Sequence, residues 1–177
     1  ALVNRRDTVS LDLAIAYYDQ LLAKDANDAF ALNYRGWAHL LLGDPKAAEA
    51  DLTRSLELQS KDAHALHARA IAWNQLGDVQ KALADFSAAI EAEPAYGQAL
   101  VNRASLYNAL GQYPEAIADC DAAIKASPKF ADAFFERGFA HAKAKRPLAA
   151  VEDFDQAILL RPTDARSLQD IPRPASR

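Results

Sequence analysis

The chain repeats the same pattern of residue types every 34 residues. The clearest unit covers residues 97–130, where apolar residues fall at helical spacing in two blocks. Gly111 ends the first block, since glycine readily takes the left-handed conformation that closes a helix. Pro128 ends the second block, because proline lacks the backbone donor and clashes with the preceding turn. Each unit therefore predicts two antiparallel helices joined by a tight turn.

Small residues occupy three fixed places of the repeated unit. They are Gly36, Ala70, Ala104 and Gly138 in the first helices, and Ala48, Ala82, Ala116, Ala150, Ser55, Ala89, Ala123 and Ala157 in the second helices. Two helix backbones approach closely only where no bulky side chain separates them, so these places are packing positions. The pattern defines full copies over residues 29–62, 63–96, 97–130 and 131–164.

The period, the small positions and the proline near the end of the unit resemble the tetratricopeptide repeat. The resemblance covers residues 29–164. It implies an all-α fold, a right-handed α-solenoid of antiparallel helix pairs, in which neighbouring repeats bury a continuous apolar seam.

The beginning of the chain departs from the repeated unit. Residues 1–28 are expected to form an N-terminal capping half-repeat, because residues 11–24 read as one amphipathic helix at second-helix positions. Ser10 is the expected N-cap of this helix, since its hydroxyl can accept a bond from the first turn. Residues 1–9 are then a shortened first helix of the half-repeat.

The last copy and the end of the chain also differ from the pattern. Ala144 and Lys145 replace the leucine–glycine pair of the other copies. A left-handed lysine costs about 1 kcal/mol, so we expect this turn to be looser. Residues 165–177 are expected to form a partial helix or tail, because Pro172 stops any helix that begins there.

Net charge and amino-acid composition limit the kinds of molecule that the protein is expected to bind. The net charge is −4, which argues against nucleic acid or an anionic membrane surface. No apolar run approaches the roughly 18 residues that a membrane helix needs. The single cysteine, Cys120, excludes an internal disulfide framework and leaves the compartment open. Because the chain contains no methionine, we expect that it does not begin at its natural start.

Charged residues also recur in register. Each copy has an arginine at the seventh place and an aspartate 16 residues later: Arg35 and Asp51, Arg69 and Asp85, Arg103 and Asp119, Arg137 and Asp153. Guanidinium can grip a carboxylate with two parallel bonds, so the pairs are expected to be structural ion pairs between the helices of each hairpin or its neighbour. The alternative is that some of the arginines face a groove and bind a ligand carboxylate.

In proteins that the sequence resembles, the first helices line a concave groove that holds a peptide or partner segment. The resemblance places these residues in it: Phe30, Asn33, Tyr34, Trp37, His64, His67, Asn74, Asn102, Asn108, Asp132, Phe135, Glu136 and Phe139. Aromatic side chains supply large contact area at low entropic cost, and amides can bond a peptide backbone. The alternative is that several of these aromatic residues pack on adjacent helices.

Two specialised forms of the family do not fit. Co-chaperones that hold the C-terminal carboxylate of heat-shock proteins place cations where this chain has Asp132 and Glu136. The asparagine ladder of the nucleocytoplasmic glycosyltransferase array needs asparagine at the sixth place of successive copies, and only Asn102 meets that requirement.

Signals for catalysis are poor. His64 and His67 are spaced to share a metal, but no third ligand is evident in the sequence. Cys120 stands where other copies have leucine or phenylalanine, which predicts a buried, inert thiol. The sequence has neither a glycine-rich phosphate loop nor a serine nucleophile motif. We therefore expect no enzyme activity, cofactor or metal.

The sequence favours a non-catalytic scaffold or adaptor that binds a peptide or a segment of a partner protein. Two alternatives stay open. One is a module that assembles into homo-oligomers through its open ends. The other is the regulatory arm of a larger protein.

Overall fold

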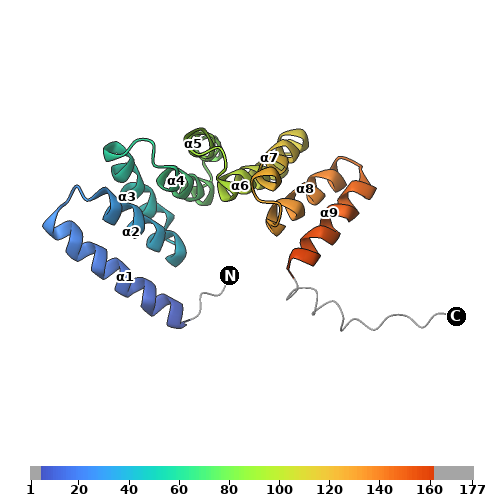
Figure 1. Ribbon diagram of the computed structural model, residues 1–177. Helices are drawn as coiled ribbons and strands as arrows, with labels where there is room; N and C mark the ends of the chain where they lie inside the picture. Colours follow the sequence, from blue (N-terminus) through green and yellow to red (C-terminus); the bar gives the residue numbers. More distant parts are fainter. Residues whose placement is uncertain (1–4, 162–177) are drawn as a thin grey trace. The chain divides into compact units, whose positions relative to one another are not determined.

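The computed structural model describes residues 5–161, and every regular element in that range is an α-helix (Figure 1). The chain divides into two compact units, residues 1–94 and 95–177. The first unit contains α1 (Arg5–Lys24), α2 (Ala29–Leu42), α3 (Pro45–Leu58), α4 (Ala63–Leu76) and α5 (Val79–Ala92). The second contains α6 (Gly97–Ala109), α7 (Tyr113–Ala126), α8 (Ala131–Lys143) and α9 (Pro147–Leu160). The protein is therefore all-α and built from paired helices, as the repeat predicts.

Left-handed glycines close the first helix of three hairpins. Gly43, Gly77 and Gly111 have φ values of 82°, 85° and 76°. In each turn the residue after the glycine donates its backbone N–H to a carbonyl near the end of the helix, as Asp44 does to His39 at 2.9 Å. Such a turn needs a residue without a Cβ penalty, which is why glycine recurs there.

The fourth hairpin uses the same turn with a lysine, so the expectation of a looser turn is wrong. Lys145 has φ 61°, the left-handed conformation. The N–H of Arg146 reaches the carbonyl of His141 at 2.9 Å, as the N–H of Gln112 reaches that of Tyr107 at 2.9 Å in the preceding hairpin. Hydrogen bonding and packing of the flanking helices hold the turn, and Lys145 bears the conformational cost.

The small residues sit where paired helices touch. A Cβ placed on Gly36 would lie 2.7 Å from Cγ of Leu52, and one on Gly138 would lie 3.0 Å from the ring of Phe154. Ala116 on α7 is fully buried and packs with Cys120 and Ala140. These contacts confirm that the repeated small positions serve close packing.

The N-termini of the helices differ between the two units. In the first unit α2 to α5 each begin with an aspartate whose carboxylate accepts a backbone N–H of the first turn: Asp28, Asp44, Asp62 and Asp78. In the described part of the second unit, α6 to α9 follow Tyr96, Gln112, Phe130 and Arg146, and none of these helices has a side-chain cap bond.

The N-terminal helix is longer than the sequence suggested. α1 begins at Arg5 and continues through Ser10 without a break. Ser10 is therefore inside the helix and is not its N-cap, and residues 5–9 are not a separate first helix. The helix extends because nothing before Ser10 interrupts it, neither proline nor glycine. The expected partial helix at residues 165–177 lies outside the described residues.

Candidate functional site

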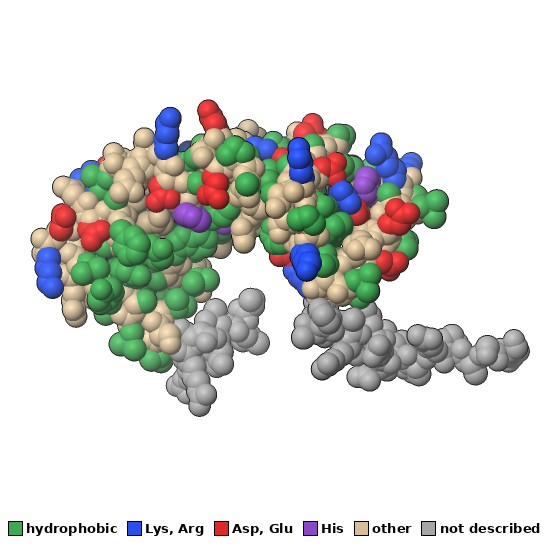
Figure 2. Space-filling view, in the orientation of Figure 1, with side chains coloured by type: hydrophobic (Ala, Val, Ile, Leu, Met, Phe, Trp, Pro, Cys, Tyr) green, Lys and Arg blue, Asp and Glu red, His purple; other side chains and the backbone are tan. Residues whose placement is uncertain are grey.

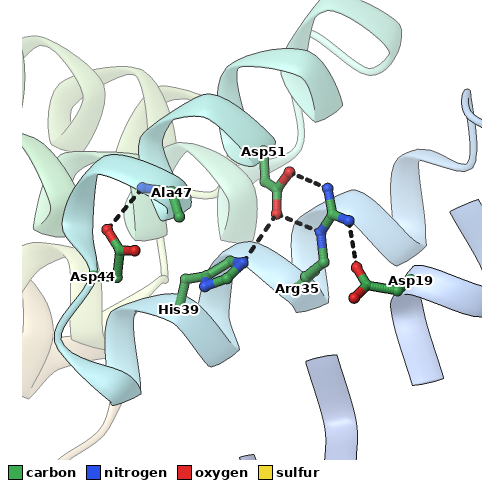
Figure 3. Close-up of polar contacts among 6 residues, drawn as sticks. All are labelled: Asp19, Arg35, His39, Asp44, Ala47 and Asp51. Atoms are coloured by element: carbon green, nitrogen blue, oxygen red, sulfur yellow. Dashed lines mark hydrogen bonds and ion pairs between the residues drawn. The ribbon is translucent and has the colours of Figure 1, made fainter. Parts of the chain in front are cut away.

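The repeated arginines each contact the aspartate 16 residues later. Figure 3 shows the first pair, in which Arg35 Nε donates to Asp51 Oδ2 at 2.7 Å and Nη2 donates to Asp51 Oδ1 at 2.6 Å. The other three pairs have the same two-bond geometry, with distances between 2.6 and 2.9 Å. Each pair joins the two helices of one hairpin.

Three of these arginines also bond to the helix that precedes their own hairpin. Arg35 Nη1 donates to Asp19 of α1 at 2.6 Å (Figure 3), and Arg137 Nη1 donates to Asp121 of α7 at 2.5 Å. Arg69 donates to the hydroxyl of Thr53 at 3.3 Å. The bonds to Asp51 raise the pKa of the Arg35 guanidinium above its usual range, against the opposing effect of burial. A guanidinium held in this way serves to join helices.

Exposed aromatic side chains define a pocket in the first unit. It has a volume of about 530 Å³ and is lined by Phe30, Asn33, Tyr34, Trp37, Leu41, Gln59, Asp62 and His64. Phe30 is 60% exposed and Tyr34 is 45% exposed. Figure 2 shows hydrophobic side chains gathered on the side of the first unit where α1 and α2 lie. Rings this exposed offer apolar contact area to another molecule.

The aromatic rings of this pocket support one another. The centroids of Phe30 and Tyr34 lie 4.2 Å apart, and Tyr34 stacks on Tyr18 of α1 at 6.1 Å. Trp37 packs on His67 of α4 with a centroid distance of 5.6 Å. Contacts of this kind fix the orientation of the rings before any ligand arrives.

The polar residues Asn33 and Asp62 of the first pocket are hydrogen-bonded to each other and to the start of α4. Asn33 Nδ2 donates to Asp62 Oδ2 at 3.0 Å. The other carboxylate oxygen of Asp62 accepts the backbone N–H groups of His64 and Ala65 at 2.9 and 3.1 Å. Both oxygens of the Asp62 carboxylate thus already accept hydrogen bonds from Asn33 and from the first turn of α4. The surface that this pocket offers to a ligand is therefore mainly apolar.

A second pocket lies entirely within the second unit. Its volume is about 570 Å³ and its lining is Ser105, Asn108, Ala109, Tyr113, Phe135, Glu136, Phe139 and Lys143. Asn108 is buried, and its Nδ2 donates to the backbone carbonyl of Glu136 at 3.0 Å and to Glu136 Oε2 at 2.9 Å. Phe135 is 52% exposed and also borders an apolar hollow of about 420 Å³ between α8 and α9.

The pockets bring together most of the predicted groove residues but not all. His67 is buried between the rings of Trp37 and Phe86, and burial lowers its pKa to about 4, with a smaller contribution from His64. Asn74 and Asn102 are outside the linings of both pockets. Asp132 forms an ion pair with Arg161 and is also outside both linings.

Among the lining residues that are absent from the predicted groove set, three lie outside the first helices of the repeats: Gln59, Asp62 and Tyr113. They belong to the connections between helices or to the start of a second helix. Asp62 could have been predicted from the sequence, because an aspartate just before a helix is a typical N-cap. The N-cap of a first helix lies at the end of the groove that the first helices line.

The described residues offer few other groups that could react or bind a metal. Burial raises the pKa of the Cys120 thiol to about 12, which keeps it in the unreactive protonated form. Within residues 5–161, no group of three or more histidine, cysteine or acidic side chains is arranged to hold a metal. None of the helices described there is both long and apolar enough to cross a membrane.

Comparison with known proteins identifies the repeat. Residues 10–63, 40–96, 67–129 and 101–165 match the family model of the tetratricopeptide repeat. Comparison with curated proteins gave no match.

Solved structures give the same fold. A crystal structure of MamA is 23% identical, with a TM-score of 0.79, covering 94% of this chain and 99% of that one. YrrB, described as a TPR protein with an unusual peptide-binding site, is 23% identical with a TM-score of 0.71, covering 90% of this chain and 82% of its own. A thermophilic TPR protein of Thermus thermophilus, TTC0263, is 18% identical with a TM-score of 0.73, covering 90% of this chain and 91% of its own. At these identities the likeness concerns the fold alone.

Proposed function

Because this chain belongs to the tetratricopeptide repeat family, we propose that it is a non-catalytic scaffold that binds a peptide or a segment of a partner protein in its aromatic pockets. Its ligand would contact mainly the first helices of the repeats, which supply most of the lining residues of both pockets. The similarity to YrrB supports a peptide as the class of ligand, since that protein is described as having a peptide-binding site.

The observation that carries the proposal is the exposure of large rings in concave sites. Phe30, Tyr34 and Phe135 are between 45% and 60% exposed, although each helix that bears them has a buried face to which they could have contributed. Aromatic side chains at the centre of a pocket are common hot spots of protein interfaces, because their burial removes much apolar area from water. The rings are also held in place beforehand, which lowers the entropic cost of binding.

Affinity capture from a lysate of the source cell tests the proposal. The bait would be compared with a variant carrying Phe30→Ala, Tyr34→Ala and Phe135→Ala, with circular dichroism as the check of folding. The matched control carries Leu148→Ala, Val151→Ala and Leu159→Ala, which removes three exposed apolar side chains from α9 instead.

A partner lost by the pocket variant and kept by the α9 variant would support the pockets as the binding site. Loss with the α9 variant alone would move the site to α9. Equal retention by both variants would refute the proposal.

Self-association is a second candidate, and the outer side of α9 favours it. Leu148 and Leu159 are 81% and 69% exposed. The other copies have Lys46, Gln80 and Pro114 at the place of Leu148, and Glu57, Glu91 and Lys125 at the place of Leu159. Exposed leucines at places that are mostly polar or charged elsewhere fit a contact with another chain. If the wild type self-associates, its average mass in sedimentation equilibrium rises with concentration, and the double variant Leu148→Lys, Leu159→Glu should reduce this rise. A wild type that stays monomeric at all concentrations would exclude this candidate.

A further inference from the structure

Glu136 differs from the other carboxylates of its neighbourhood. Asp119 and Asp153 are bound by Arg103 and Arg137, Asp121 is also bound by Arg137, and Asp132 pairs with Arg161. Glu136 has no ion pair with any residue in the described range 5–161. Its partner is an amide, the Nδ2 group of Asn108. The Glu136 carboxylate therefore has no cation within ion-pair distance among the described residues.

The geometry leaves Glu136 ready to accept a donor. Asn108 is buried and its Nδ2 group bridges the backbone carbonyl and Oε2 of Glu136, at 3.0 and 2.9 Å. This bridge fixes the amide and orients the carboxylate on the wall of the second pocket. One carboxylate oxygen is used by Asn108, and a carboxylate has further acceptor sites on its other oxygen.

The walls around Glu136 are aromatic. Phe135, Phe139 and Tyr113 line the same pocket of about 570 Å³. A carboxylate beside aromatic rings suits a guanidinium or ammonium group, which bonds to the oxygen atoms while its stem and its charge contact the rings. Such a site penalises an acidic side chain, because its charge would repel Glu136.

Lys143 is the one basic residue in the lining of this pocket. Its Nζ lies 5.4 Å from the centroid of the Phe139 ring, so this ring already attracts a cation. Lys143 follows Glu136 by seven residues, about two turns of α8, so both residues lie on the same face of the helix. The Lys143 ammonium forms no ion pair with the Glu136 carboxylate, so this carboxylate can still bond a cation from another molecule.

We propose that the second pocket binds an arginine or lysine side chain of the partner segment, with Glu136 as the counter-charge and Phe135, Phe139 and Tyr113 as the walls. This inference rests on the proposed function, since it specifies the peptide that the aromatic pockets hold. It reverses the charge preference of the carboxylate-binding co-chaperones, whose cations are replaced here. The first pocket, whose Asp62 is occupied by Asn33 and the start of α4, takes an apolar side chain.

The test is selection of peptides from a random 12-residue library displayed on phage. The baits are the wild type, Glu136→Gln, the pocket variant described above, and Glu115→Gln as the matched control. Glu115 is exposed in the first turn of α7 and outside both pockets, so its change alters the net charge equally. The wild type and Glu115→Gln should select peptides with a basic residue near apolar ones, and Glu136→Gln should lose this preference.

A double-mutant cycle then assigns the contact. One selected peptide is synthesised with its basic residue and with norleucine in that place, and each is titrated against wild type and Glu136→Gln. We expect the basic peptide to bind Glu136→Gln about five- to tenfold more weakly, and the norleucine peptide to bind both proteins equally. Equal weakening of both peptides would overturn the assignment.

The outcomes separate the two proposals. Peptides that need Phe30, Tyr34 and Phe135 but show no basic preference would overturn the role of Glu136 and leave the proposed function standing. Selection of no peptide that depends on these aromatic residues would overturn both.

Discussion

Replacing Lys145 by glycine should stabilise the protein against unfolding by about 0.5–1 kcal/mol. Lys145 has φ 61°, and a left-handed conformation costs a residue with a Cβ about 1–2 kcal/mol. Glycine removes this cost but gives the unfolded chain more conformational freedom, which offsets about 0.4–1 kcal/mol. The difference between the two effects is the expected gain.

Urea unfolding followed by circular dichroism measures this gain, together with the reciprocal change in the neighbouring hairpin. Gly111 has φ 76° and no atom closer than 3.9 Å to the place of a Cβ, so Gly111→Lys adds conformational cost without a clash. It should destabilise the protein by a similar amount, and the double variant should be close to wild type. The thermal midpoint should move by about 2–4 °C per kcal/mol. A Lys145→Gly variant no more stable than wild type, with Gly111→Lys neutral, would show that the left-handed turn carries no conformational cost here.

Two further predictions concern buried polar groups. His67 has its pKa lowered to about 4 in the folded state, against about 6.5 when unfolded, so the unfolded state binds more protons as the pH falls from 6.5 towards 4. The contribution of His67 to the free energy of unfolding should therefore be about 2 kcal/mol smaller at pH 5 than at pH 7, as measured by urea unfolding. His67→Gln should reduce this dependence of stability on pH. An unchanged pH dependence in the variant would contradict the burial argument. Arg69→Ala leaves Asp85, which is 8% exposed, without its two bonds from the guanidinium. It should destabilise the protein by about 3 kcal/mol, and loss of ligand binding with the urea midpoint unchanged would instead favour a ligand-binding arginine.

The fold followed from the sequence because the same packing requirement recurs at every copy. Gly36 and Gly138 are small since Leu52 and Phe154 pack against them. The fourth turn was mispredicted because a local propensity was given more weight than the packing of the helices it connects. The start of α1 was mispredicted because Ser10 is a good N-cap in isolation, although the preceding residues continue the helix.

The candidate site was less predictable from the sequence. Helical position alone assigned Phe30, Phe135 and His67 alike to the groove, whereas Phe30 and Phe135 are exposed and line pockets and His67 is buried. That difference depends on how neighbouring helices pack: Trp37 and Phe86 cover His67, and both come from other helices. The hydrogen bond between Asn108 and Glu136 joins residues that are 28 positions apart in the sequence, and no local sequence pattern predicts it.

The unequal distribution of aspartate caps gives the two units different resistance to local opening. α2 to α5 each start with a carboxylate bonded to the first turn, whereas α6 to α9 start without such a side-chain bond in the described residues. Amide protons in the first turns of α6 to α9 should therefore exchange with deuterium sooner than those of α2 to α5. The pocket around Glu136 belongs to the faster-exchanging unit. A bound segment there would slow exchange in α6 and α8, so binding would be visible as protection of a region that opens readily in the free protein.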